Sequence, residues 1–149
     1  MIDSRPTTVY CASKLNRHPM WREWKAELSP SVIRIVSTWH DDPDVETLEL
    51  DAKQCMFGWQ ANRRQILSAE HLLVFGTADD KLQGTLVEIG MALASDKYPK
   101  IHLVGSFDWG SWRFLDDVAI YATLHNALTA ITGAPMHHPV KEHLLHDPT

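Results

Sequence analysis

Five short apolar runs alternate along the chain with longer segments whose apolar residues recur at helical intervals. The runs cover residues 7–12, 33–39, 72–75, 101–104 and 119–121. Short apolar runs bounded by turn residues predict strands that are buried on both faces of a parallel sheet. The segments between them predict helices over residues 18–28, 50–68 and 86–94, and from Thr123 to a stop at Gly133. This alternation predicts an α/β fold, a doubly wound five-stranded parallel sheet of the Rossmann or flavodoxin-like kind with right-handed connections.

The predicted elements end at Gly133. We therefore expect a single α/β domain over residues 1–133 and a C-terminal extension over residues 134–149, whose composition differs. The predicted helix 50–68 is outlined by side chains that step at helical intervals, namely Met56, Trp59 or Gln60, Arg63 and Leu67.

The stretch from His71 to Gly105 has the order strand, polar loop, apolar helix and strand. Gly84 and Thr85 open its helical segment, in which Glu88 is the only charged residue. A helix that is apolar all round is expected to be buried. Its one carboxylate would then lie just beyond the carboxyl end of a strand, where open α/β sheets bind their ligands.

Two compatible explanations account for a carboxylate at this position. Thr85 as N-cap and Glu88 three residues later would form a capping box, in which each side chain binds the other's backbone N–H. Alternatively, Glu88 is functional. A helix N-terminus favours an anion and would keep the carboxylate ionised even when partly buried, and such a carboxylate is a nucleophile for a glycosidic carbon.

The same stretch resembles a known family. The segment GTLVEIGMALASDKYPKIHLVG is similar to the G-T/G-x-x-E-x-G-x-A-x-A-x-x-K motif of the nucleoside 2-deoxyribosyltransferase-like proteins, and TVYCAS, VSTW and DDVAIYATLHNAL resemble other regions of short bacterial and phage members. The likeness covers about residues 7–131. Cytokinin-activating phosphoribohydrolases also carry G-x-G-T-x-x-E, but Leu82 occupies the position of their first glycine here. The resemblance implies that Glu88 is the catalytic nucleophile.

The resemblance also implies two helpers for Glu88. It places the family's active-site tyrosine at Tyr10, where the hydroxyl would steady the nucleophile; a packed strand tyrosine is the alternative. An acidic residue of the loop before Gly84 would bind the base and protonate its leaving nitrogen, which makes Asp80 or Asp79 the candidate general acid. Loop aspartates are otherwise common turn formers.

Further binding candidates follow the predicted strands, because the carboxyl ends of parallel strands meet at one edge of the sheet. Ser13 follows the first strand, and Trp39 and Asp41 end the second. A flat ring such as Trp39 can stack on a nucleobase or can belong to the core. The remaining candidates are Gly84, Thr85 and Trp112.

One departure from the family bears on the substrate. Many members carry an aspartate for the sugar hydroxyls about eight residues before the third strand, where this chain has Asn62, Arg63 and Arg64. A guanidinium in place of a carboxylate suits a phosphate. Arg63 therefore favours a nucleoside 5′-monophosphate, with a solvated helix face as the alternative.

Composition limits the class of partner. A net charge of −5 argues against a nucleic-acid surface, so we expect a small-molecule nucleoside or nucleotide. The absence of a signal-like segment and of about 18 consecutive apolar residues predicts a cytoplasmic protein without a membrane span. Cys11 and Cys55 are expected to be buried, reduced thiols. We expect no cofactor and no metal, although four histidines lie between His137 and His146.

The sequence thus predicts transfer or hydrolysis of an N-glycosidic bond through a covalent glycosyl-glutamate. A nucleotide-sensing module and a phosphoribohydrolase are the alternatives. A homo-oligomer built from dimers, with a site completed by a neighbour, is also expected. The loop after the fourth strand holds more aromatic side chains than a small domain is expected to bury alone, namely Phe107, Trp109, Trp112 and Phe114.

Overall fold

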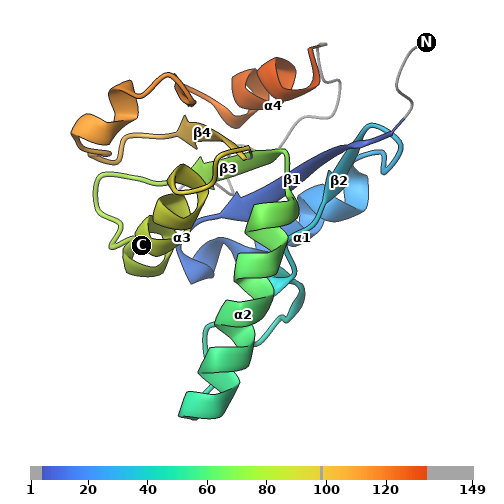
Figure 1. Cartoon of the computed structure of the whole chain (residues 1–149). Helices are drawn as coiled ribbons and strands as arrows, with labels where there is room; N and C mark the ends of the chain where they lie inside the picture. The colour runs from blue at the N-terminus through green and yellow to red at the C-terminus, as the bar shows by residue number, and fades with distance from the viewer. Residues whose placement is uncertain (1–4, 98, 134–149) are drawn as a thin grey trace.

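The protein folds as one α/β domain around a parallel sheet (Figure 1). The computed structural model describes residues 5–97 and 99–133. Its strands are β1 (Thr7–Ala12), β2 (Ile33–Ile35), β3 (His71–Phe75), β4 (Lys100–Val104) and β5 (Val118–Tyr121). Its α-helices are α1 (His18–Glu27), α2 (Ala52–Ser68), α3 (Gln83–Leu93) and α4 (Leu124–Thr132). The strand order is β2-β1-β3-β4-β5 with every pair parallel, which confirms the predicted fold class.

Helices cover both faces of the sheet, as the apolar strand runs require. Helices α1 and α4 pack on one face through residues such as Trp21 and Leu128, and α2 and α3 pack on the other through Ile66 and Ile89. Successive strand residues alternate between the faces. In β1, Cys11 therefore belongs to the core under α1 and α4, whereas Tyr10 belongs to the core under α2 and α3.

Several element boundaries differ from the prediction. Strand β2 ends at Ile35, and Trp39 begins a short 3-10 turn instead of ending the strand. Helix α3 begins at Gln83 and is not buried all round, since Val87 and its exposed neighbours Leu86 and Leu93 face outward. Cys55 is exposed.

The aromatic loop after β4 is mostly covered by its own chain. Trp109 is only 4% exposed, and Phe107 and Trp112 pack against the same core. Phe114 is the exception, at 75% exposure. The expectation that this domain could not bury these rings alone is therefore wrong for Trp109, whereas Phe107 and Trp112 are only partly buried and Phe114 is exposed.

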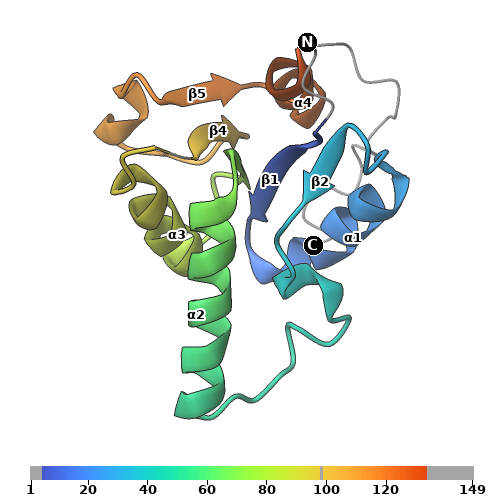
Figure 2. The ribbon, with the colours of Figure 1, turned by 45° about the vertical axis from the view of Figure 1, so that its right-hand side comes forward.

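Helix α2 extends well beyond the sheet. Figures 1 and 2 both show its N-terminal half projecting from the rest of the domain, with the preceding loop running beside it. Asp51 and Gln54 form a capping box at its start. Of its 17 residues, all of which the structure describes, Ile66 is the one that is buried. Across the described residues, no helix combines the length and apolarity that crossing a membrane requires.

Candidate active site

A cavity of about 650 Å³ opens at the carboxyl ends of β1 and β3. Its walls come from the turn after β1, the loop before α2, the projecting part of α2 and the start of α3. Glu88 lines it from α3 and is itself only 7% exposed. The edge of the sheet that holds this cavity is the one at which doubly wound folds bind ligands.

The Tyr10 hydroxyl donates a hydrogen bond to Oε2 of Glu88. Tyr10 is fully buried in β1 and is directed toward α3 because of the alternation of strand side chains. The two residues, 78 positions apart in sequence, are thus brought together as the resemblance implied. Burial, together with the adjacent Glu88, raises the pKa of Tyr10, so the phenol remains a protonated donor.

Burial raises the pKa of Glu88 to about 7, and the hydrogen bond from Tyr10 opposes this rise. The expected capping box is absent. The helix begins at Gln83, so Glu88 is its sixth residue, beyond the first turn in which the helix dipole acts. Thr85 donates instead to the carbonyl oxygen of Ser13 at 3.2 Å. Glu88 therefore lies beyond the reach of the helix N-terminus, and its burial opposes the ionisation that was expected there, because burial raises its pKa.

Ser13 lines the cavity but its hydroxyl is already engaged. It accepts a hydrogen bond from Nε1 of Trp21 at 2.8 Å and donates one to the carbonyl oxygen of Lys14 at 2.9 Å. Together with the bond from Thr85, these contacts hold the end of β1 against the start of α3. Ser13 therefore fixes the floor of the cavity around Glu88.

Two indole rings provide much of the apolar wall. Trp39 lines the cavity and is held by a hydrogen bond from its Nε1 to the carbonyl oxygen of Cys11 at 2.8 Å. Trp59 lines it from α2 and covers Gly84, where an added Cβ would lie 3.7 Å from the ring. Sequence analysis did not select Trp59 as a binding residue. Its spacing from Cys55 and Asn62, which also line the cavity, was the available signal.

Six of the proposed site residues do not line the cavity: Tyr10, which lies behind Glu88, Asp80, and the four that follow here. Asp41 pairs with Lys25 at 2.9 Å, Arg63 is exposed on α2, and Asp79 is exposed in its loop. Trp112 packs partly buried against the core that contains Trp109.

Asp80 is also outside the cavity lining, although it is buried. Its Oδ2 accepts a hydrogen bond from the backbone N–H of Thr77 at 2.9 Å and lies 4.0 Å from Nη2 of the buried Arg17. These contacts hold the loop between β3 and α3. They engage Oδ2 of Asp80, whereas its buried Oδ1 has no hydrogen-bond partner among the described residues.

The cavity contains other polar groups that sequence analysis did not select. Asn62 faces it from α2 in place of Arg63, and Lys14 and Lys81 are the cations among its lining residues. Glu46 lines the opposite wall, where its Oε2 lies 3.0 Å from Nε2 of His18. The lining thus combines two carboxylates, two lysines and three amides, those of Asn16, Asn62 and Gln83, with an apolar wall.

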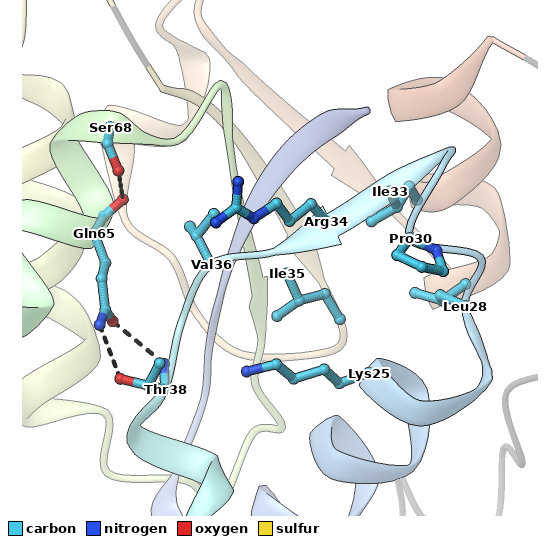
Figure 3. A pocket seen from close by; sticks show the side chains of 10 residues that line it. All are labelled: Lys25, Leu28, Pro30, Ile33, Arg34, Ile35, Val36, Thr38, Gln65 and Ser68. Carbon is cyan, nitrogen blue, oxygen red and sulfur yellow. Dashed lines mark hydrogen bonds between the residues drawn. The ribbon is translucent and has the colours of Figure 1, made fainter. Parts of the chain in front are cut away.

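A second hollow, of about 580 Å³, lies along the outer edge of β2 and is a different kind of surface (Figure 3). Gln65 of α2 bridges to Thr38 there, with its amide donating to the hydroxyl at 2.8 Å. Lys25 and Arg34 are the charged side chains of its lining. A buried carboxylate comparable to Glu88 is not among these residues.

Within residues 5–97 and 99–133, no group of three or more His, Cys, Asp or Glu side chains is arranged to hold a metal ion. The histidines from His137 to His146 and the rest of the predicted extension lie outside the described residues. No protein-family model matches the chain, and no curated protein sequence matches it either.

Proposed function

We propose that the chain is an enzyme that breaks the N-glycosidic bond of a nucleoside or nucleoside 5′-monophosphate through a covalent glycosyl-Glu88 intermediate. One observation carries the proposal, namely a single buried glutamate on the floor of a cavity, hydrogen-bonded to a buried tyrosine and with a pKa near 7. Burial without a cationic partner makes a carboxylate poorly solvated and therefore a better nucleophile. The resemblance of the Gly84 to Gly105 segment to the deoxyribosyltransferase-like motif supports the same role.

The reaction follows double displacement. Oε2 of Glu88 is held by Tyr10, so Oε1 attacks C1′ while the bond from C1′ to the base nitrogen breaks. The bonding electron pair leaves with that nitrogen, which takes a proton from solvent. A second base nitrogen or a water then attacks C1′ and loses a proton to solvent, while the bond from C1′ to Oε1 breaks and its electron pair returns to the Glu88 carboxylate. This gives transfer or hydrolysis by the two-step logic of retaining glycosidases.

The apolar wall suits the nucleobase. Trp39 and Trp59 offer flat faces on which a base can stack, each contact being worth about 1–3 kcal/mol. Asn62 adds an amide with two donors and one acceptor oxygen, so it can bind sugar hydroxyls or a base edge as the aspartate of the family would. A neutral amide cannot act as an acid or a base, so Asn62 does not protonate the leaving group, and solvent is the proton source in this proposal.

A 5′-phosphate would bind Lys14 and Lys81. Arg63, the residue expected to bind it, lies on the outer surface of α2, whereas the two lysines line the cavity that holds Glu88. Charged hydrogen bonds are worth about 1.5–3 kcal/mol each. We therefore expect a monophosphate to bind more tightly than its nucleoside, and Lys14→Ala, but not Arg63→Ala, to remove that preference.

A nucleotide-binding module without turnover is the second candidate. It is favoured by the absence of Asp80 from the cavity lining, since the proposed acid has no path to a leaving base. The fold itself is compatible with either function.

One experiment separates the candidates. The purified protein is incubated with a panel of ribo- and deoxyribonucleosides and their 5′-monophosphates, each with and without free adenine, and products are resolved by chromatography. Release or exchange of base, together with an intact-protein mass increased by one glycosyl group in wild type but not in Glu88→Gln, supports the enzyme. Saturable nucleotide binding without any product would support the binding module instead.

A further inference from the structure

A second carboxylate faces the active-site cavity, from the loop before α2. Glu46 lies in the segment that joins the 3-10 turn Trp39–Asp41 to α2 and that runs from the carboxyl end of the sheet toward the tip of the helix (Figure 2). Its side chain is 45% exposed. The mechanism above gives this carboxylate no role, because Glu88 is the nucleophile and solvent supplies the proton.

A buried imidazole holds the Glu46 carboxylate in place. His18 is the first residue of α1 and is only 6% exposed. Its Nε2 lies 3.0 Å from Oε2 of Glu46, and on the other side of the ring its Nδ1 lies 3.0 Å from Nη2 of Arg22. Three side chains thus form a connected chain that leads from α1 to the cavity.

The guanidinium of Arg22 fixes the direction of these hydrogen bonds. A guanidinium has donors and no acceptor, so Nδ1 of His18 accepts the hydrogen bond from Arg22. The ring proton then lies on Nε2, because the tautomer of an imidazole is set by the bond that its other nitrogen makes. Nε2–H accordingly donates to Oε2 of Glu46. The chain therefore presents Glu46 to the cavity as an acceptor and not as a donor.

Oε1 of Glu46 remains for a ligand. Among the side chains that the structure describes, His18 is the hydrogen-bond partner of this carboxylate, and it engages Oε2. A carboxylate held at one oxygen keeps the lone pairs of the other. Lone pairs directed at a bound molecule favour an N–H or O–H group and repel a carbonyl oxygen. Glu46 can therefore distinguish ligands that differ in one donor or acceptor.

The surroundings of Glu46 suit a nucleobase better than a sugar or a phosphate. The other residues of its loop that line the cavity are all apolar, namely Val45, Leu48 and Leu50. The ring of Trp39 adds a flat face from the turn before this loop. A phosphate would be repelled by the carboxylate, whereas Lys14 and Lys81 attract it. A sugar carries hydroxyl groups on both faces, so the flat base with its polar edge is the part of a nucleoside that fits this wall.

We infer that Glu46 contacts the edge of the nucleobase and selects bases with an exocyclic amino group, such as adenine and cytosine, over their oxo counterparts hypoxanthine and uracil. The inference rests on the proposed function for its class of ligand, a nucleoside or its 5′-monophosphate. The amino group donates an N–H to Oε1, as the amino group of cytosine does to Glu and Asp in DNA-binding proteins. An oxo group at the same place sets a second acceptor against the carboxylate.

Binding of two matched pairs tests this selection: adenosine with inosine, and cytidine with uridine, each also as the 5′-monophosphate. The protein carries Glu88→Gln so that the ligands stay intact, and dissociation constants are measured by calorimetry. In at least one pair the amino member should bind at least about tenfold more tightly than the oxo member. Adding Glu46→Gln should bring the two members within about twofold of each other, because an amide can offer either a donor or an acceptor.

Glu49→Gln is the matched control, since it makes the same change of charge in the same loop at an exposed side chain outside the cavity lining. The amino preference should persist in it. Equal binding within both pairs, a preference that survives Glu46→Gln, or one that Glu49→Gln also removes would overturn the inference.

Base release by the wild-type protein tests the proposed function separately. Turnover without an amino preference would remove this inference and leave the enzyme, whereas an amino preference without turnover would remove the enzyme and leave the role of Glu46. Failure of every one of these ligands to bind would overturn both.

Discussion

Glu88 and Asp80 are both buried carboxylates at the same edge of the sheet, but their surroundings differ. Their exposed fractions are 7% and 6%. Asp80 accepts a backbone N–H and lies 4.0 Å from a buried guanidinium, and it has no part in the cavity lining. Glu88 accepts one phenolic O–H, lines the cavity, and has a pKa raised to about 7. Burial alone therefore does not distinguish a reactive acid; what distinguishes it is burial without a compensating cation, next to a space for substrate.

Glu88 and Asp80 are expected to differ most in their contributions to catalysis. Glu88→Gln keeps the shape of the side chain and removes the nucleophile, so kcat for base release should fall at least about a thousandfold. Asp80→Asn should change kcat less than about tenfold, because Asp80 does not reach the cavity. Both are measured by product release under saturating substrate. A loss in Asp80→Asn as large as that in Glu88→Gln would instead identify Asp80 as the proton donor.

The second difference is expected in stability. Asp80→Asn retains an acceptor for the Thr77 N–H but leaves the buried Arg17 guanidinium without the neighbouring carboxylate. Removing one member of a buried ion pair costs about 3–5 kcal/mol, and we expect a loss near 3 kcal/mol in urea unfolding. Asp79→Asn is the matched control, since the neighbouring side chain is exposed and should change stability by less than about 0.5 kcal/mol. Equal effects of the two changes would show that the Arg17 contact is unimportant.

Substitution of Glu88 should change the stability of the fold in the opposite direction to substitution of Asp80. Its folded-state pKa, about 7, lies above the usual 4.5 of an unfolded chain. The folded state therefore binds the proton more tightly, and stability is lost as pH rises from 4.5 to 7. Glu88→Gln should consequently stabilise the fold by about 2–3 kcal/mol at pH 8 and change it little at pH 4. Urea unfolding at the two pH values measures this, and a destabilised variant at pH 8 would contradict the burial of an unpaired charge.

Apolar runs predicted the sheet well because a parallel strand covered on both faces must be apolar nearly throughout. The paired strands and the two helical layers follow from that pattern, whereas the proximity of Tyr10 to Glu88 was implied by the resemblance of the two segments to a known family. The start of α3 does not follow from the pattern of apolar residues. The Thr85 hydroxyl could cap the helix or bind a distant carbonyl, and its partner, the carbonyl oxygen of Ser13, is 72 residues away. Local spacing has no information about such a contact.

Helix α2 shows the same limit of prediction from local spacing in the sequence. A periodic stripe indicates which residues share a side, but it does not say which side faces the cavity. Arg63 lies on the outer stripe, whereas Asn62, one position earlier and about 100° around the helix, lines the cavity. The orientation of a helix depends on which surface the rest of the domain leaves to be covered.

Tyr10→Phe should produce the smallest change in activity, and this change should be specific to the pH dependence. In wild type, an ionised nucleophile implies activity that is half-maximal near pH 7 and falls about tenfold for each pH unit below it. The Tyr10 hydroxyl stabilises the Glu88 carboxylate, because its hydrogen bond lowers the pKa of that group. A lost hydrogen bond to a charged group is worth about 1.5 kcal/mol, so the midpoint should move about one unit upward. Activity at pH 7 would then drop severalfold and recover near pH 9. Tyr121→Phe is the control, because the Tyr121 hydroxyl lies 3.2 Å from Nδ1 of His102 and has no contact with Glu88. The dependence of its activity on pH should match that of wild type. A Tyr10→Phe protein that loses activity equally at every pH would show that Tyr10 positions Glu88 without altering its ionisation.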